Sequence, residues 1–405
     1  MSDWTHSTVR DVISHIASGP SPTCEERNAS GVEWGLLKTT AATWDGWNEN
    51  AHKVPPREYW GQVRLEVQRD DVVITKAGPR NRVGVVVFVP QTRPRLMVSG
   101  KMVLLRPDRS KIVPRLLADV IASPPSQKYL DDRTAGMAEA QTNFANSALL
   151  TTPLLLPPVE EQRRIAEILD SIDETVQVTK RIIAKLEVSR QGLLDDLLGA
   201  IMRHEPLGEN LDRIDGGWSP ACAERPPSGA EWGVLKVSSI TREDFNPAES
   251  KTLPRSLPPR PDLIVRVGDV LTARANGVAD LVGRTAFVDH LGGRNLLISD
   301  KTLRLVPGPN LSPRYLSYCM QHEMVRRQVR GLISGSTGQG NISQAELRSL
   351  WVAIPPRHEQ HAIESVVASV DGRLMAERHE LSKLRSLRGG VAADLLSGRV
   401  RTVAT

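Results

Sequence analysis

Few residues in this sequence have the type and spacing that catalysis requires. His358 and His361 lie three residues apart beside Glu359, a set that could ligate a metal ion. The positions 198 residues earlier hold Glu160 and Arg163, which do not repeat that ligand set. We therefore interpret the two histidines as surface residues at the start of a helix, with a metal site as the alternative.

The glycine-rich run from Gly335 to Gly340 is the other candidate for small-molecule chemistry. A glycine loop that binds phosphate links a strand to a helix, and this run lacks that context. The sequence also has no GxxxxGKS or GxxxxGKT loop, and no Asn-Pro-Pro-Tyr or Asp-Pro-Pro-Tyr motif for amino-group methylation. We expect no catalytic site, which argues against a methyltransferase with a fused DNA reader. The glycine run is interpreted as a loop that faces solvent or a nucleic acid.

The composition is that of a globular chain with a small excess of positive charge. Its 405 residues are 40% hydrophobic and 24% charged, with a formal net charge of +5. That length suggests two to three domains, and the charge permits a polyanionic partner without proving one. The three cysteines lack CxxC spacing, and neither a signal peptide nor a membrane-spanning apolar run is present. We expect a protein of the reducing cytoplasm that contacts no membrane.

The chain repeats itself at an offset of 198 residues. The segment from Trp34 to Lys38 (WGLLK) recurs as Trp232 to Lys236 (WGVLK). The same offset relates several further pairs: Cys24 and Cys222, Asp71 and Asp269, Pro157-Pro158 and Pro355-Pro356, Glu161-Gln162 and Glu359-Gln360. Because this period far exceeds that of solenoid repeats, we infer a duplicated pair of domains. The two matched cysteines then lie in different domains, where a packing role explains them better than a disulfide bond.

The first three quarters of each half mix strand and helix signals. Short apolar runs bounded by glycine and proline predict strands: Val72–Thr75, Val83–Val89 and Met102–Leu105, with partners at Val270–Ala273, Thr285–Val288 and Thr302–Leu305. Helices are expected at 114–122 and 313–330. The pattern is typical of an α+β fold.

The last quarter of each half is different, because its apolar residues follow the 4-3 spacing of a coiled-coil seam. In the first half the seam holds Ile165, Leu169, Ile172, Val176, Ile183, Leu186, Leu193 and Leu197, with Thr179 and Arg190 at the remaining positions. In the second half it holds Ile363, Val367, Val370, Leu374, Leu381, Leu384, Val391 and Leu395, with Glu377 and Arg388 at the matching positions. Helix stops are expected at Gly199 and at Leu396-Ser397-Gly398.

Connectivity predicts how the two helices pair. The first helix delivers the chain to the second domain, so the second helix must run back if it is to bury its seam on the first. The helices are therefore expected to be antiparallel, and the tail beyond Arg399 should lie near residues 4–12, where Val400 and Val403 would add apolar contact or a strand. The alternative is that each helix packs on its own domain.

Several motifs resemble those of one known family. Gly268-Asp269-Val270-Leu271 is similar to its "GDIL" strand, and Gly283-Arg284 to the strand that follows. Gly338 to Ser343 resembles the segment before its helical region, and Ile354-Pro355-Pro356 with Glu359-Gln360 resembles its "PPxxEQ" helix start. The first half carries the same elements with more drift, since Asp70-Asp71 replaces Gly-Asp. Together these motifs resemble the specificity subunits of type I restriction-modification systems over essentially the whole chain.

The resemblance implies two pseudo-repeated α/β target-recognition domains joined by two long antiparallel coiled-coil helices. We place the domains at 1–153 and 204–352, the first spacer helix at 154–203, and the second spacer helix with the tail at 353–405. The implied function is non-catalytic: each domain reads one half of a bipartite, asymmetric DNA target, and the helices set the gap.

The resemblance also implies partners. These are double-stranded DNA, two modification (methyltransferase) subunits and two restriction (motor-nuclease) subunits. No cofactor is expected in this chain, because S-adenosylmethionine, ATP and Mg belong to the partner subunits. Residues expected to face outward from the helices and to be free for a partner are Arg163, Arg164, Lys180, Arg181, Arg373 and Arg378. A structural scaffold without a DNA role is the alternative.

Candidate DNA contacts are polar residues outside the helical seam, because phosphates and base edges are bound by cations, hydroxyls and amides. In the first domain they are Lys38, Thr39, Lys76, Arg80, Arg82, Lys101 and Asn143. In the second they are Lys236, Ser238, Arg274, Asn276, Arg284, Lys301, Gln339 and Asn341. The basic residues that match between the halves are expected to contact phosphates, and residues that differ are expected to give specificity.

Overall fold

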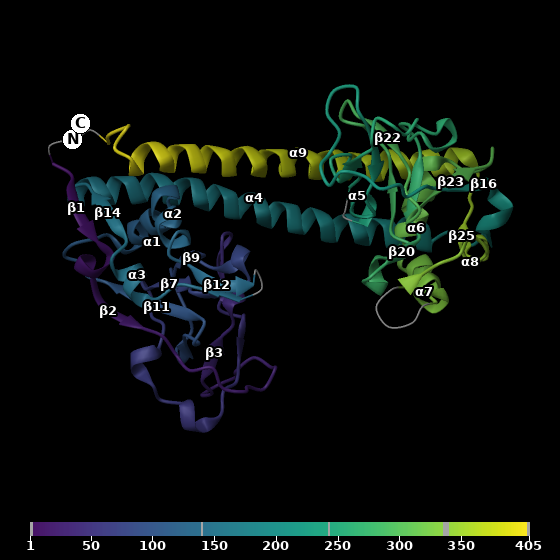
Figure 1. Cartoon of the computed structure of the whole chain (residues 1–405). Coiled ribbons are helices and arrows are strands. Elements are labelled where there is room, and N and C mark those ends of the chain that lie inside the picture. The colour runs from purple at the N-terminus through teal and green to yellow at the C-terminus, as the bar shows by residue number, and fades with distance from the viewer. Residues whose placement is uncertain (1–2, 139–140, 242–243, 335–339, 403–405) are drawn as a thin grey trace. The chain divides into compact units, whose positions relative to one another are not determined.

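The computed structural model describes residues 3–138, 141–241, 244–334 and 340–402. The chain forms two compact units, Met1–Lys180 with Glu380–Thr405, and Arg181–His379. Each unit combines helices and strands (Figure 1), as the α+β prediction requires.

The first unit is built on a four-stranded antiparallel sheet in the order β2-β11-β7-β9. These strands are β2 (Ile13–Ala17), β11 (Met102–Pro107), β7 (Val72–Thr75) and β9 (Val86–Phe88). All four residues of β7 are buried, as expected of a short apolar run in a sheet covered on both faces. Helix α1 (Pro114–Ala122), which has the predicted bounds, packs on this sheet and contributes Leu116, Leu117 and Ile121 to its core.

Shorter elements complete the first unit. A three-stranded sheet contains β10 (Leu96–Met97), β3 (Gly35–Leu37) and β6 (His52–Lys53), and another contains β12 (Ala135–Ala138), β13 (Gln141–Asn143) and β8 (Ala77–Gly78). Two-stranded pairs are β1 (Thr5–Thr8) with β14 (Pro153–Leu156), and β4 (Ala42–Thr43) with β5 (Gly46–Trp47). The remaining short helices are α2 (Pro124–Asp131) and α3 (Asn146–Leu150).

The second unit has the same strand order. Its main sheet runs β16 (Leu211–Gly216), β23 (Thr302–Pro307), β19 (Val270–Ala273) and β21 (Thr285–Phe287). A second sheet holds β18 (Ser250–Thr252), β17 (Trp232–Leu235) and β22 (Asn295–Leu297), and the two-stranded pairs are β15 (His204–Pro206) with β25 (Trp351–Ala353) and β20 (Ala275–Asn276) with β24 (Gly340–Asn341). Short helices are α5 (Ser238–Thr241) and α8 (Gln344–Arg348).

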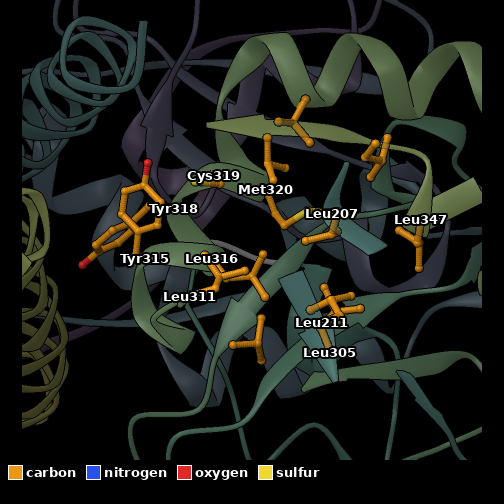
Figure 2. Close-up of a cluster of buried hydrophobic side chains, with 14 of the residues drawn as sticks. Leu207, Leu211, Leu305, Leu311, Tyr315, Leu316, Tyr318, Cys319, Met320 and Leu347 are labelled. Carbon is orange, nitrogen blue, oxygen red and sulfur yellow. The ribbon is translucent and has the colours of Figure 1, made fainter. Parts of the chain in front are cut away.

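The predicted helix over 313–330 is wrong in one respect, because it is broken at His322 into α6 (Pro313–Gln321) and α7 (Glu323–Leu332). His322 has extended backbone angles, φ −63° and ψ 139°. The first unit has the same break at Ser123, and there the following Pro124 predicts it from the sequence; the second unit has no proline at that position. Figure 2 shows Tyr315, Leu316 and Met320 of α6 among buried side chains of the second unit's core.

Two long helices extend through both units: α4 (Val159–Gly199) and α9 (Arg357–Leu396), each ending where a stop was predicted. In the first unit, Ile165 and Leu169 near the start of α4 share one core with Ala392 and Leu395 near the end of α9. In the second unit, the end of α4 shares a core with the start of α9. The two helices are therefore antiparallel within each unit (Figure 1).

Every predicted seam position of both helices is buried or half-buried. The helix ends also pack on the domains beside them, so the alternative of separate packing describes part of the arrangement. The C-terminal tail lies where it was expected, since Arg401 donates to Glu161 at 2.7 and 2.8 Å and lies over Trp4. Residues 397–402 form no strand, so the alternative of an added strand is wrong for these residues. Val400 is 48% exposed, and Val403 lies outside the described residues.

Candidate nucleic-acid interface

Three of the predicted contact positions in the first unit are brought together by main-chain hydrogen bonds. The carbonyl of Lys101, just before β11, accepts from the amides of Lys76 and Ala77 at 2.9 and 3.3 Å. The carbonyl of Lys76 accepts from the amide of Phe144, which follows Asn143. Lys76, Lys101 and Asn143 therefore lie at one end of the sheet, because β7 and β11 pair with Thr75 opposite Met102.

The second unit gathers the matching positions in the same way. The carbonyl of Lys301 accepts from the amide of Arg274 at 2.9 Å, and the carbonyl of Arg274 accepts from the amide of Ile342 at 2.9 Å. In addition, β20 pairs with β24, so that Asn276 lies opposite Gly340 and Ala275 lies opposite Asn341. Arg274, Asn276, Lys301 and Asn341 form one group, and Gln339 lies outside the described residues.

The side chains of the two groups are not equally available. Lys76 is half-buried, and its Nζ donates to Ser18 Oγ at 3.1 Å and to Asn146 Oδ1 at 3.4 Å. Burial lowers the pKa of Lys76. By contrast, Arg274, Lys101 and Lys301 are exposed. At the position shared by Lys76 and Arg274, the second unit therefore presents a cation to solvent and the first unit directs it inward.

Other predicted arginines bond to the protein itself. Arg82 donates to the carbonyls of Thr39 and Ala42 at 2.8 and 3.1 Å, which joins the segment after β8 to the segment that leads from β3 into β4. Arg80 donates to both carboxylate oxygens of Asp131, each at 2.8 Å. Arg284 is exposed and donates to Asp280 at 3.2 Å.

Three further candidates, which follow β3 and β17 in the chain, pair with glutamates. Lys38 lies 3.3 Å from Glu26, and its counterpart Lys236 lies 3.6 Å from Glu224. Ser238 Oγ donates to Glu249 at 2.8 Å. These residues form a second polar set, with an acidic partner beside each cation.

The Gly-Asp motif has a structural task. Gly268 has φ +98°, in the left-handed region that favours glycine, and its counterpart Asp70 adopts φ +70°. The following aspartate, Asp71, is buried and accepts from Arg106 Nε and Nη2 at 2.8 and 2.9 Å. The equivalent Asp269 accepts from Arg304. The drift from Gly to Asp at position 70 therefore leaves the turn intact.

The PPxxEQ motif also has a structural task, carried by its glutamine. Gln162 Oε1 accepts from the amide of Val113 at 2.9 Å, and Nε2 donates to the carbonyls of Lys111 and Pro157. Gln360 repeats the pattern with the amide of Ser312 at 2.9 Å and two carbonyls. Each buried glutamine fastens the start of a long helix to the start of α1 or α6.

Two aspartates that sequence reasoning missed attach the domains to the helices. In the first unit, Asp45 of the β4–β5 hairpin lies 2.9 Å from Lys180 of α4 and 2.7 Å from Arg385 of α9. In the second unit, Asp244 pairs with Arg378 of α9. Their 199-residue spacing differs by one from the repeat, and that near-match is the signal that could have identified them.

The histidines near the start of α9 do not gather with other potential metal ligands in the described ranges. The side chain of His358 is 81% exposed and His361 is exposed, and no group of three or more potential ligands gathers in the described ranges. Cys24 and Cys222 are free and half-buried, and Cys319 is free and buried. Among the helices of the described residues, none combines the length and apolar character needed to span a bilayer.

The chain is similar to known proteins of type I restriction systems. Residues 68–188 match the type I restriction modification DNA specificity domain. The EcoEI specificity subunit of Escherichia coli is 37% identical over 164 residues, which are 40% of this chain and 27% of that protein. The chain thus covers about a quarter of that relative. The EcoKI specificity subunit of Escherichia coli is 24% identical over 316 residues, 73% of this chain and 68% of that protein.

The fold has solved counterparts. The S subunit of a type I restriction-modification system from M. genitalium matches with a TM-score of 0.57 at 13% identity, covering 97% of this chain and 96% of that chain. A chain from a structural study of assembly and conformational transition in the type I R-M system matches with a TM-score of 0.51 at 18% identity, covering 98% of both. Residues 68–188 are therefore similar to the type I restriction modification DNA specificity domain, and the resemblance to type I specificity subunits that the sequence predicts is confirmed.

Proposed function

We propose that this chain is the non-catalytic DNA-recognition subunit of a type I restriction-modification complex, and that it reads a bipartite, asymmetric target. The observation that carries the proposal is the repeated sheet order, β2-β11-β7-β9 and β16-β23-β19-β21, in units whose loops differ in sequence. Two similar scaffolds with different loops suit two different half-sites, because sequence is read by the side chains that reach base edges.

The architecture we propose is a pair of pseudo-repeated recognition domains joined by an antiparallel coiled coil. The buried seam positions and the matched helix starts support it. The domain limits 1–153 and 204–352 stay predictions, since the compact units divide each long helix near its middle, at 180/181 and 379/380. The helices then set the gap between the half-sites.

For the DNA contacts, we propose that the exposed cations Lys101, Arg274 and Lys301 bind phosphates. They are exposed, and each lies beside the main-chain junction that gathers the candidate loops. Asn276 and Asn341 in the same group are the candidates for base reading, because an amide can pair with adenine. Lys76 and Arg82 are proposed instead to hold the loops in place, given their internal hydrogen bonds.

The proposed partners are double-stranded DNA, two modification subunits and two restriction subunits, with S-adenosylmethionine, ATP and Mg held by those subunits. For docking, Lys180 and Arg378 must be withdrawn from the predicted free set, because they pair with Asp45 and Asp244. Arg163, Arg181 and Arg373 are exposed and remain candidates, although Arg163 and Arg373 pair with Glu160 and Glu377 of their own helices. The sixth predicted residue, Arg164, is half-buried.

The function is tested by sequencing the methylome of a host with and without this gene, in the presence of its modification subunit. We expect one split motif with a fixed gap to be methylated only when the gene is present. Unchanged methylation would refute the proposal. Purified chain alone should transfer no methyl group from labelled S-adenosylmethionine, and transfer would contradict the non-catalytic assignment.

A further inference from the structure

Two arginines occupy matched positions in the helical seam, where an apolar residue is expected. Arg190 of α4 and Arg388 of α9 are separated by the 198-residue repeat. Their side chains are 19% and 25% exposed, so both are largely withdrawn from solvent. A long cation at such a position lowers the stability of a seam unless it has a specific partner. The partners are therefore informative.

In the first unit, Arg388 joins three helices. Its Nε and Nη2 donate to the two carboxylate oxygens of Asp173 on α4, each at 3.1 Å. Its Nη2 also donates to Asp119 of α1, which is only 5% exposed. Burial opposes the charge of Arg388, but Asp119 and Asp173 outweigh it and raise the pKa of the guanidinium. Arg115 of α1 also forms an ion pair with Asp173, so Asp173 is bound by arginines from both α1 and α9. We call this set of contacts between α1, α4 and α9 the first junction.

In the second unit, Arg190 forms the equivalent junction between α4, α9 and α6, but its partner on α6 is a neutral side chain rather than an aspartate. It pairs with Asp371 of α9, and its Nη1 donates to Gln321 of α6 at 2.9 Å. The hydroxyl of Tyr318 of α6 donates to the other oxygen of Asp371 at 3.0 Å. Burial and the nearby Asp371 raise the pKa of Tyr318, so this hydroxyl stays protonated and able to donate. Asp371 and Asp173 are themselves separated by 198 residues.

The other two polar seam residues behave differently. The hydroxyl of Thr179 donates to the carbonyl of Thr175 on its own helix. Glu377 accepts from Arg373, four residues earlier on its own helix. Thr179 and Glu377 also match at the 198-residue offset, so the chain contains one matched pair of seam residues that cross between helices and one matched pair that do not.

An apolar seam alone does not define the axial register of two helices. Sliding by one heptad restores the same apolar contacts after a shift of about 10 Å. Arg388 donates two bonds to the Asp173 carboxylate, and Arg190 donates one bond to Asp371 and another to Gln321. Such directed bonds have a fixed geometry, and a shift of even one residue, about 1.5 Å, would separate the partners. Because each arginine also contacts α1 or α6, the register of the helices is tied to the placement of the adjoining domain.

We propose that Arg190 and Arg388 are positioning residues that fix the register of α4 against α9, and thereby determine the gap accepted between the two DNA half-sites. The inference rests on the proposed function, and it adds the residues that specify the gap. It assigns base reading to other residues, so the half-site sequences should not depend on these arginines.

The test is methylome sequencing of the complete complex carrying Arg190→Met and Arg388→Met together. We expect methylation of the same two half-sites, with discrimination between the wild-type gap and gaps one base pair longer or shorter reduced by about tenfold or more. The matched control is Thr179→Val with Glu377→Leu, which also removes polar seam residues and should keep the single gap. The variant Arg190→Lys with Arg388→Lys retains both positive charges but lacks the planar guanidinium with its fixed donors. We expect its discrimination between gap lengths to lie between those of wild type and the methionine pair.

The outcomes separate this inference from the proposed function. If wild type methylates no split motif, the proposed function itself fails. If wild type does so and the methionine pair keeps the same single gap in an assembled complex, the register inference is overturned. Should the double methionine variant fail to assemble, the double lysine variant provides the test. An unrelaxed single gap in the assembled double lysine variant would overturn the inference too.

Discussion

The buried ion pair between Asp71 and Arg106 offers a quantitative test of the fold. Asp71 is 1% exposed and accepts three hydrogen bonds, two from Arg106 and one from the amide of Gln68 at 2.7 Å. Replacing Asp71 by Asn keeps the size of the side chain but removes the charge. Arg106 is then left beside an amide that can accept only one of its two bonds.

The size of the destabilisation depends on the partners that Arg106 keeps once the Asp71 carboxylate is gone. Breaking a fully buried ion pair costs about 3–5 kcal/mol. Arg106 is 29% exposed and keeps the carbonyl of Glu66 at 3.2 Å, so water and this carbonyl hydrate part of its charge. We expect Asp71→Asn to lower the opening free energy of β11 by about 2–3 kcal/mol. The matched change Asp269→Asn should cost about 1 kcal/mol, because Arg304 keeps Asp215 at 2.9 Å.

The assay is native-state hydrogen exchange, read by mass spectrometry on peptides that cover β11 and β23 separately. This readout treats each unit by itself, which a single global melting curve would not. Equal costs for the two variants, or a cost below about 0.5 kcal/mol for Asp71→Asn, would refute the reasoning.

Three further predictions concern local features. Gly268→Ala should lower the free energy of unfolding by about 1 kcal/mol in urea titration, since φ is +98° and the space around it is open, and no loss would contradict the left-handed turn. Gln360→Leu should cost about 2–3 kcal/mol, as it removes three buried hydrogen bonds, and a near-neutral effect would show that the helix start does not need them. Hydrogen bonding by Arg401 lowers the pKa of Glu161. The ion pair between Arg401 and Glu161, which we call the tail clasp, is therefore fully formed above about pH 4.3 and weakens as the pH falls below that value. Limited proteolysis of the tail should therefore speed up in acid for wild type, and it should be fast at every pH for Glu161→Gln; a pH-independent wild type would contradict the clasp.

The features that the sequence predicted best are the duplicated strands and the buried faces of the two long helices. The 198-residue offset located matching strands at Val72–Thr75 and Val270–Ala273, because a duplicated sequence keeps its core positions even as its loops diverge. The 4-3 spacing identified the buried faces of α4 and α9, since burial along a long helix follows its period.

What the sequence could not predict depends on tertiary contacts. Lys76 and Arg274 are equivalent in sequence, yet Ser18 and Asn146 bind only the lysine, and those partners are distant along the chain. The break at His322 has no local signal. The arginines at 190 and 388 looked like interruptions of the seam, because their carboxylate partners lie on the other long helix. Of the candidate DNA contacts, all fifteen roles remain predictions.

The central claim, that each domain reads its own half of the target, is tested most directly by exchanging one domain. Residues 205–352 would be replaced by the equivalent domain of another specificity subunit, and the methylome of the host would be sequenced. We predict that one half of the methylated motif changes while the other half stays the same. A change in both halves, or in neither, in an assembled and active complex would contradict the claim.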